Sequence, residues 1–555
     1  MPISRRRFLA HSAAVVVAGL AAGCTSDDGD GDQGADDTVA TPDTVAAAPT
    51  TPETATPETA APTTDAPATT TPAIELEPLE LSADPFTLGV ASGDPSPGGV
   101  VLWTRLAPDP LQGGGMPDGD VDVVWEVSHT EDFVELWGTG TVAATASYAH
   151  SVHVVAPVQA GGTWYYRFRA GQYTSPVGRT QAAPSATAEP AQVRVASASC
   201  QNYQDGFYTA WADVAAARPD LVVFLGDYIY ESGAATVGVG GVVRSHGTPE
   251  PTTLEAYRDR YALYKSDPDL QAAHAACPWI ITWDDHEVEN NYAGLTPQDP
   301  ADAAGFAERR RAAYQAWWEH QPVALPPPVD GLTIYRTARW GDLLELVVLD
   351  GRQYRTDQAC GDPGLSLDPP CDETFDATRT MLGDEQEAWL FEQIAGRSTT
   401  WQALAQQTIF GDVTLGGAVL NYDQWDGYPV ERNRIVEAFD PAANTVVLTG
   451  DIHFAGTGTL RQGGRGVGDP VAVEFVATSI SSGGLIDPAV TEVVKSIPDI
   501  LDVELEHRGW ILHTVTPERW TAEYRMVDTV KEPGAEVYVH ATYAIDAGTN
   551  TVGFA

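Results

Sequence analysis

The fold of this chain is decided by the stretch Val222-Val223-Phe224-Leu225-Gly226-Asp227-Tyr228-Ile229-Tyr230-Glu231. Its apolar first half is typical of a buried parallel strand, and the strand ends abruptly at Gly-Asp. Ligands in open α/β sheets bind just beyond the carboxyl ends of such strands. A carboxylate placed there, with a phenol shortly after it, can reach one metal ion. An aspartate after a strand also commonly caps a turn, so Asp227 and Tyr230 alone leave both interpretations open.

The surrounding sequence repeats a strand–helix–strand pattern. Strand patterns at 193–199 and 221–225 flank a helical pattern at 207–217, which makes one βαβ unit. Further strands are expected at 279–283, 343–349, 445–448 and 471–475, further helices at 254–264 and 303–320, and alternating β patterns at 509–526 and 536–545. This order predicts an α/β domain over residues 190–555.

Four of these strands end in side chains that bind metals. The first ends at Cys200, the second at 226–230, the third at Asp284-Asp285-His286-Glu287, and the fourth at Gly450-Asp451-Ile452-His453. Carboxylates and imidazoles suit hard and borderline metals, and a thiolate or phenolate suits Fe(III). One such strand end is weak evidence, whereas four in one domain predict a metal centre.

The order of these motifs resembles that of the binuclear metallophosphatases, and most closely that of the alkaline phosphatase D (PhoD-like) family. The matching stretches are 198–201, 225–230, 283–287, 449–453 and 478–484. The resemblance covers roughly residues 85–530. It implies a four-layer α/β/β/α metallophosphatase domain, of the α/β or α+β class, preceded by an immunoglobulin-like β-sandwich. Purple acid phosphatases share the Gly-Asp-x-x-Tyr element, in which the tyrosine binds Fe(III).

The resemblance also implies an iron site and a bridging ligand. Asp227 would bridge the two metals. Cys200, Tyr230 and His453 would bind Fe(III), with Cys200 standing where broader metallophosphatases carry an Asp-x-His pair.

The second metal site would be built from carboxylates. Asp285 stands where the wider family has an asparagine, and Asp451 where it has a histidine. Two carboxylates harden this site, which favours Ca(II) over zinc by ligand type, although other divalent metals are compatible. His286 would contact the phosphate and stabilise or protonate the leaving oxygen, and with Asp227 it would form the catalytic pair.

Five further residues are candidates for supporting roles. Arg352 follows an apolar strand and suits a phosphate-binding fork, or else an ordinary surface salt bridge. Asn290 and Asn291 are expected to contact metal or phosphate. Asp284 and Glu287 are expected to orient His286, or to belong to a solvated turn.

The function predicted from this constellation is metal-dependent hydrolysis of phosphate esters, by an alkaline phosphatase or phosphodiesterase. A metal-bridging hydroxide would attack phosphorus in line, so that no covalent enzyme nucleophile is needed. Small phosphate esters and phospholipid head groups are both compatible substrates. The alternatives are a phospholipase D-like phosphodiesterase of the same family and a catalytically inactive surface-binding lipoprotein. Gln406 and Gln407 stand where related enzymes carry another histidine motif, which leaves the coordination number open.

The N-terminal region predicts export. Residues 1–24 combine Arg5-Arg6 with an apolar run and resemble a twin-arginine signal that ends in a lipoprotein-type Cys24, although a generic signal peptide remains an alternative. Residues 25–80 are rich in Thr, Pro and Ala and predict an extended tether. Residues 81–187 show short alternating strands and predict the β-sandwich. The expected location is extracellular or at the cell surface, and the twin-arginine export machinery is the expected partner.

Charge and cysteine content limit the possible partners. The 555 residues carry 31 Lys and Arg against 77 Asp and Glu, a formal net charge of -46. This excess argues against nucleic acid and anionic membranes, which are polyanions. It fits a soluble exported protein with an acidic, well-solvated surface and also a site that binds cations, and a monomer is expected. Cys360 and Cys371 flank a Gly/Pro-rich loop, and they either form a disulfide in an oxidising compartment or remain separate thiols. Cys277 has no ligand context and is expected in the core.

Overall fold

The structure is a computed structural model that describes residues 74–328, 331–364 and 366–555. The chain divides into two units, residues 1–70 and 71–555, and the fold described is that of the second. The predicted signal, the acylated Cys24 and most of the predicted tether therefore lie outside the described residues. Among the described helices, none combines the length and the apolar character needed to cross a membrane.

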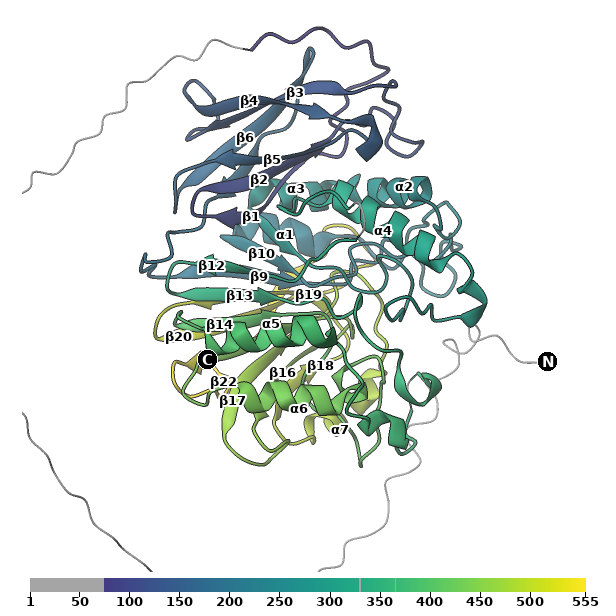
Figure 1. The fold of residues 1–555 in the computed structure, drawn as a ribbon, viewed down its shortest axis with the longest axis vertical. Helices are drawn as coiled ribbons and strands as arrows, with labels where there is room; N and C mark the ends of the chain where they lie inside the picture. Colours follow the sequence, from purple (N-terminus) through teal and green to yellow (C-terminus); the bar gives the residue numbers. More distant parts are fainter. Residues whose placement is uncertain (1–73, 329–330, 365) are drawn as a thin grey trace, which may run out of the picture. The chain divides into compact units, whose positions relative to one another are not determined.

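A ten-stranded mixed sheet is the larger of the two sheets at the centre of the described fold (Figure 1). Its order is β22-β21-β20-β19-β9-β10-β11-β1-β2-β5. The strands are β1 Val90–Ser96, β2 Gly99–Arg105, β5 Ser151–Pro157, β9 Val193–Ala198, β10 Leu221–Phe224, β11 Trp279–Ile281, β19 Arg508–Val515, β20 Arg519–Val527, β21 Val537–Asp546 and β22 Gly553–Phe554. β9, β10 and β11 run parallel. Every residue of β10 is buried because both faces of the sheet are covered, which explains its uninterrupted apolar sequence.

The second of these two sheets has seven strands. Its order is β12-β13-β14-β15-β17-β16-β18. The strands are β12 Arg336–Trp340, β13 Leu344–Val348, β14 Trp401–Ala405, β15 Thr445–Thr449, β16 Ala455–Arg461, β17 Pro470–Val476 and β18 Ile500–Glu504. β13, β14, β15 and β17 run parallel, so their carboxyl ends lie at one edge of this sheet. The carboxyl ends of β9, β10 and β11 likewise lie at one edge of the first sheet, and the two edges can carry a shared site.

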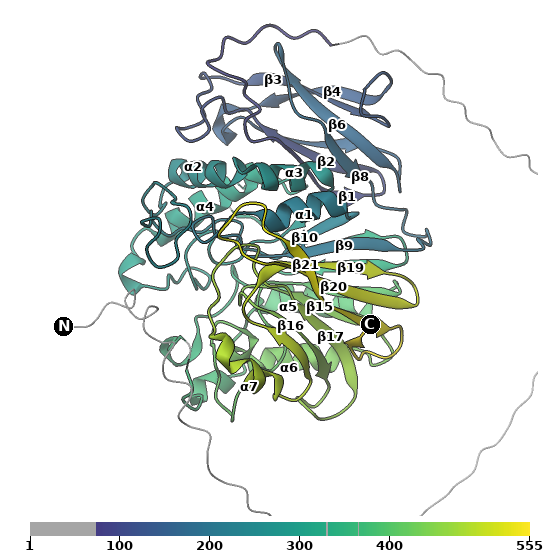
Figure 2. The same cartoon turned by 180° about the vertical axis from the view of Figure 1, so that it is seen from behind.

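Helices cover the outer faces of both sheets, which gives four layers (Figures 1 and 2). The helices are α1 Thr209–Ala217, α2 Leu254–Lys265, α3 Pro268–Ala276, α4 Phe306–His320, α5 Gly383–Ala395, α6 Pro429–Ala438 and α7 Thr491–Lys495. One apolar cluster lies between α1–α4 and the first sheet, a second between the two sheets, and a third between the second sheet and α5 and α6. The multilayer α/β architecture expected from the sequence is therefore present.

The N-terminal strands form two packed sheets, and one of these two continues into the ten-stranded sheet. β3 Val121–Ser128, β4 Leu136–Ala144, β6 Thr163–Ala170, β7 Tyr173–Thr174 and β8 Gly178–Gln181 form a five-stranded sheet. It packs through an apolar cluster against β1, β2 and β5. Those three strands extend the ten-stranded sheet, since β1 pairs in parallel with β11 at Gly93 and Trp279. The boundary expected near residues 187–190 thus runs through a continuous sheet.

Two of the predicted cysteine environments are confirmed. Cys360 and Cys371 form a disulfide, which decides between the alternatives left open by the sequence. Cys277 is a buried free thiol within the helix-side core, as expected.

Candidate metal centre

The candidate site lies where parallel strands of the two sheets end. Cys200 follows β9, Asp227 follows β10, Asp285 follows β11 and Asp451 follows β15. Backbone hydrogen bonds link these strand ends, including Cys200 N to Gly226 O at 3.0 Å. Four segments that are far apart in the sequence therefore present their side chains to one region.

Several candidate ligands have an unusual backbone conformation. The φ angles of Cys200, Asp227, Asp451 and His453 are 59°, 60°, 63° and 61°, in the left-handed region that costs energy for non-glycine residues. Gly226, immediately before Asp227, has φ 112°. A Cβ at Gly226 would lie 2.5 Å from Asp284 Cβ, so only glycine lets these two loops approach. The sharp strand-to-loop turns direct the ligands inward.

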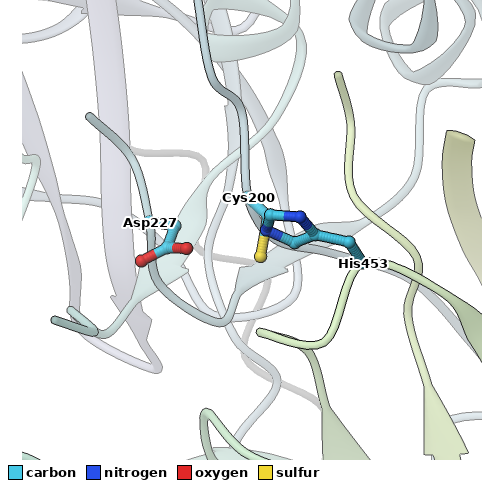
Figure 3. A group of neighbouring side chains, drawn as sticks. All are labelled: Cys200, Asp227 and His453. Carbon is cyan, nitrogen blue, oxygen red and sulfur yellow. The ribbon is translucent and has the colours of Figure 1, made fainter. Parts of the chain in front are cut away.

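One group of ligands matches the predicted iron site. Potential ligand atoms of Cys200, Asp227 and His453 all lie within 4.8 Å of one another, and Figure 3 shows the three side chains converging. The phenol of Tyr230 donates to Asp227 Oδ2 at 2.7 Å and lies 3.0 Å from His453 Nε2. The structure thus brings together all four residues that the sequence assigned to this site.

The orientation and the neutral state of the His453 imidazole are those of a metal ligand. Its Nδ1 donates to the Gly483 carbonyl at 2.6 Å, which directs Nε2 towards Tyr230. Burial lowers the pKa of His453 to about 3, so the ring is neutral and the lone pair lies on Nε2, which faces the Tyr230 hydroxyl. Ser482 Oγ contacts the Tyr230 hydroxyl at 2.9 Å and fixes its position.

A second group consists of carboxylates and shares Asp227 with the first. Carboxylate oxygens of Asp227, Asp284, Asp285 and Asp451 lie within 4.8 Å of one another. Asp227 Oδ1, Asp284 Oδ2 and Asp285 Oδ1 are buried and have no hydrogen-bond partner within the described part of the chain. A cation beside these oxygens would compensate for their burial in the ionised form. The donor set therefore fits two neighbouring metal ions with Asp227 between them.

The raised pKa values of the acidic groups also indicate a site that is suited to cations. Burial and the neighbouring carboxylates raise the pKa of Asp451 to about 6 and that of Asp227 well above its usual range. Burial, followed by the charges of Asp227 and Asp451, also raises the pKa of the Cys200 thiol. These negative groups are therefore stable together in their ionised forms only when positive charge lies between them.

Arg352 supplies part of that positive charge. Its side chain is fully buried, with Nε in contact with Asp284 and Nη1 and Nη2 each 2.7 Å from an oxygen of Asp423. Nη2 also lies 3.5 Å from Asp451 and 3.6 Å from Asp285. Burial opposes ionisation of Asp423, but Arg352 and Arg355 outweigh it and lower its pKa. The alternative of a surface salt bridge is wrong, because the guanidinium is buried. All three guanidinium nitrogens contact carboxylates, so the structure gives no support to the phosphate-binding fork predicted for Arg352.

His286 lies at the open side of the site. Its side chain is 18% exposed and its Nδ1 lies 2.7 Å from Glu231 Oε2. Burial alone would lower the pKa of His286, but Glu231, Asp285 and Asp227 together raise it well above its usual range. The direct contact with Glu231 therefore favours the protonated imidazole, which is the form that can stabilise a phosphate anion or donate a proton.

The two asparagines contribute backbone groups to the site. Asn290 N donates to Glu231 Oε1 at 3.1 Å, and Asn291 N donates to Asp285 Oδ2 at 2.6 Å. Contacts of their side chains with metal or phosphate stay a prediction.

Comparison with known proteins identifies the family. Residues 195–524 match the PhoD-like phosphatase family, and residues 71–184 match the PhoD-like phosphatase N-terminal domain. The chain is 45% identical over 475 residues to alkaline phosphatase D of Bacillus subtilis (strain 168), covering 83% of this chain and 81% of the relative. The chain belongs to the PhoD-like phosphatase family.

Solved structures agree with this assignment. The solved structure described as "Structure of PhoD" superimposes with a TM-score of 0.82 at 43% identity, covering 86% of this chain and 93% of that one. Purple acid phosphatase PPD1 from yellow lupin (Lupinus luteus) has a TM-score of 0.52 at 11% identity, covering 82% and 73% of the two chains, which shows a shared fold. This PhoD-like phosphatase is accordingly a phosphoric ester hydrolase of the metallophosphatase type.

Four residues of this PhoD-like phosphatase that the sequence did not single out support the ligands. Glu231, rather than Asp284 or Glu287, is the carboxylate that contacts the His286 ring. Asp423 holds Arg352, Gln424 Nε2 donates to Asp451 Oδ2 at 2.5 Å, and Arg508 contacts the His453 carbonyl. Glu231 directly follows Tyr230, a signal that sequence reasoning could have used.

Glu287 and Gln407 make structural contacts near the site. Glu287 accepts hydrogen bonds from the backbone N–H groups of Asp227, Tyr228 and Asp284, at 3.1, 2.6 and 2.8 Å, so it joins two ligand loops. Gln407 Nε2 donates to the Trp283 and Leu349 carbonyls. Gln407, which stands near the position of a histidine motif in related enzymes, therefore links the ends of strands in the two sheets through hydrogen bonds.

Proposed function

We propose that this chain is an exported phosphatase or phosphodiesterase that uses an Fe(III)–Ca(II) centre to hydrolyse phosphate esters. The observation that carries the proposal is the sharing of Asp227 between the thiolate–imidazole group and the carboxylate group. A site with the thiolate of Cys200 and the phenolate of Tyr230 suits Fe(III), and an all-oxygen site with Asp285 and Asp451 suits calcium.

Side chains of the site would divide the reaction between them. When bound, two adjacent metal ions supply an activated water for in-line attack and neutralise charge on the phosphoryl group. His286, oriented by Glu231, would hold a proton on Nε2 and place it at the leaving oxygen or at a phosphoryl oxygen. Arg352 would keep Asp284, Asp285 and Asp451 ionised rather than touch the substrate.

The features predicted for the N-terminal region complete the proposal. Arg5-Arg6 would direct export by the twin-arginine machinery, and acylated Cys24 would anchor the chain at the cell surface. Residues 25–80 would then hold the catalytic region away from the membrane, with residues 81–187 as an immunoglobulin-like module. A monomer is sufficient for this arrangement, because every proposed ligand comes from one chain.

The proposal is tested by assaying a p-nitrophenyl monoester and a methyl p-nitrophenyl diester with protein loaded with iron and calcium. We expect turnover of at least one ester, abolished by Asp227→Asn, which removes the shared carboxylate charge. Loss of activity with retained folding, measured by circular dichroism, supports the two-metal role. If neither ester is hydrolysed, or if Asp227→Asn keeps full activity, the proposed function is contradicted.

A further inference from the structure

An apolar cavity of about 340 Å³ lies beside the metal centre. It is bounded by β16, β18, α6, α7 and the segment 409–424. The apolar residues that line it include Ile409, Phe454, Val476, Ile486, Val494 and Val503. The volume falls within the range of small-molecule sites, about 300–1,000 Å³. Apolar walls that face a hollow of this size lack van der Waals partners, so a hydrocarbon group that fills the cavity gains those contacts.

The charged groups on the cavity wall are already paired. Arg432 contacts Asp426, Arg461 lies 2.7 Å from Asp499, and Glu474 accepts two backbone N–H groups at 2.7 and 2.9 Å. An ionic ligand would have to break such pairs, at the desolvation cost of buried charges. The wall therefore favours an uncharged apolar ligand.

The cavity and the metal centre share a wall. Along the segment that follows β15, Asp451 and His453 belong to the metal-binding groups, while Ile452 and Phe454 line the cavity. Gln424 also lines the cavity and donates to Asp451 Oδ2 at 2.5 Å. A group bound in the cavity would thus lie one layer of backbone away from the second metal site.

A loop joins the rims of the two sites. Gly483 accepts the hydrogen bond of His453, and Ile486, three residues later, lines the cavity. Leu485 lies between them and is 49% exposed. Leu485 therefore offers exposed apolar surface on the segment that connects residues of the two sites, and burying it under a hydrocarbon chain would be favourable.

We propose that this cavity is a subsite for a hydrocarbon substituent on phosphorus, so that the enzyme prefers phosphodiesters in which one ester group carries an uncharged alkyl chain. This inference rests on the proposed phosphoester hydrolysis. It adds a specificity-determining site built from β16, β18 and α7, outside the metal ligands.

The test is a series of p-nitrophenyl phosphodiesters whose second alcohol is methyl, butyl or octyl. Each methylene that enters the cavity can raise kcat/KM by up to about fourfold. We expect kcat/KM to rise at least tenfold from methyl to octyl, mainly through a lower KM, because the chain is bound equally in the ground and transition states.

Two matched variants locate the effect. Val494→Trp fills the cavity and should remove the dependence on chain length while leaving hydrolysis of the methyl ester unchanged. Val134→Trp adds the same side chain at a position that is 80% exposed and outside the cavity lining, and it should keep the dependence. If both variants show the same dependence as the wild type, the assignment is overturned.

A competition measurement needs no variant. 1-Decanol should raise the KM of the octyl ester with little effect on kcat, because both compounds would occupy the cavity. Activation by 1-decanol, or inhibition that lowers kcat alone, overturns the subsite and indicates a separate ligand. A wild-type rate that does not change with chain length also overturns the inference but leaves phosphoester hydrolysis intact. The absence of turnover with every ester contradicts the proposed function and the inference with it.

Discussion

At the residue scale, the metal centre depends on charges that are balanced deep in the protein. Arg352 lies among four aspartates, and its planar guanidinium makes a two-point contact with Asp423 that a lysine cannot reproduce. Removing one partner of such a buried network leaves uncompensated charge, which is far more costly than losing a surface ion pair.

Arg352→Lys should therefore lower the free energy of unfolding by about 3 kcal/mol. The measurement is urea unfolding of the metal-free protein, followed by circular dichroism. Arg434→Lys is the control, because Arg434 is 39% exposed and pairs with Glu387, so its replacement should cost less than about 1 kcal/mol. Equal midpoints for the two variants would contradict the role assigned to Arg352.

Glu231 should act on catalysis through His286. Glu231→Gln keeps the size of the side chain but removes the charge that favours the protonated imidazole, so kcat should fall by about 10- to 100-fold. Iron and calcium contents, measured by elemental analysis, should not change. Glu255→Gln, on the exposed first turn of α2, should leave kcat at the wild-type value. Loss of metal in Glu231→Gln would instead assign Glu231 to the metal sites.

Residues of the site could be predicted from the sequence where they directly follow a strand. Asp227 and His453 follow apolar runs, and the parallel strands then bring them to one edge. Asp423 and Gln424 could not be predicted this way, because they lie in a loop between β14 and α6 and reach the site only through tertiary contacts. The position of a residue after a strand predicts metal ligands better than it predicts the residues that hydrogen-bond to those ligands.

At the scale of elements, β19 and β20 close the interior between the two sheets around a neutral histidine. Trp520 Nε1 donates to His513 Nδ1 at 3.0 Å, and His513 Nε2 lies 2.8 Å from Ser197 Oγ on β9. Burial lowers the pKa of His513 from 6.5 to about 3. Protonation of Nδ1 would place a charge in the core and break the Trp520 hydrogen bond.

His513→Gln should change the acid stability of the protein. His513 is protonated in the unfolded chain below about pH 6.5, whereas in the folded chain it stays neutral down to about pH 3. The wild type should therefore lose about 1.4 kcal/mol of unfolding free energy per pH unit relative to the variant in this window, and nothing above it. Urea unfolding from pH 7.5 to 4 measures the difference, and parallel curves would contradict the burial of a neutral His513.

Most elements were predictable because their patterns are local. The expected strand at 221–225 is β10 Leu221–Phe224, and the helix expected at 254–264 is α2 Leu254–Lys265. α2 begins where predicted because Thr253 accepts the hydrogen bond of Ala256 N. The assignment of strands to two sheets was not predictable, because the sequence of a buried parallel strand does not indicate which strand pairs with it.

At the scale of the whole molecule, the N-terminal strands and the catalytic region fold as one body. β1 pairs with β11, Trp103 Nε1 donates to the Glu319 carbonyl at 2.9 Å, and Arg105 lies 2.9 Å from His320. The expected independent sandwich could not be distinguished from this arrangement by sequence, because alternating strands look alike whether or not their edge continues into another sheet.

Truncation should reveal this continuity. A chain of residues 71–555 should keep the melting temperature and kcat/KM of the full chain, because it contains the whole second unit. A chain that begins at residue 190 loses β1, β2 and β5 and exposes the edge of β11, so it should fail to accumulate as a soluble folded protein. A soluble, active fragment of residues 190–555 would contradict the shared sheet.

We propose that Cys200 and Tyr230 bind iron beside a carboxylate site that shares Asp227. The most direct measurement is the metal content of the purified protein together with its visible absorption spectrum. We predict about one iron per chain and a visible thiolate- or phenolate-to-Fe(III) charge-transfer band, which Cys200→Ser removes or shifts together with activity. A colourless, iron-free preparation with full activity, or Cys200→Ser with an unchanged band and rate, would contradict the account.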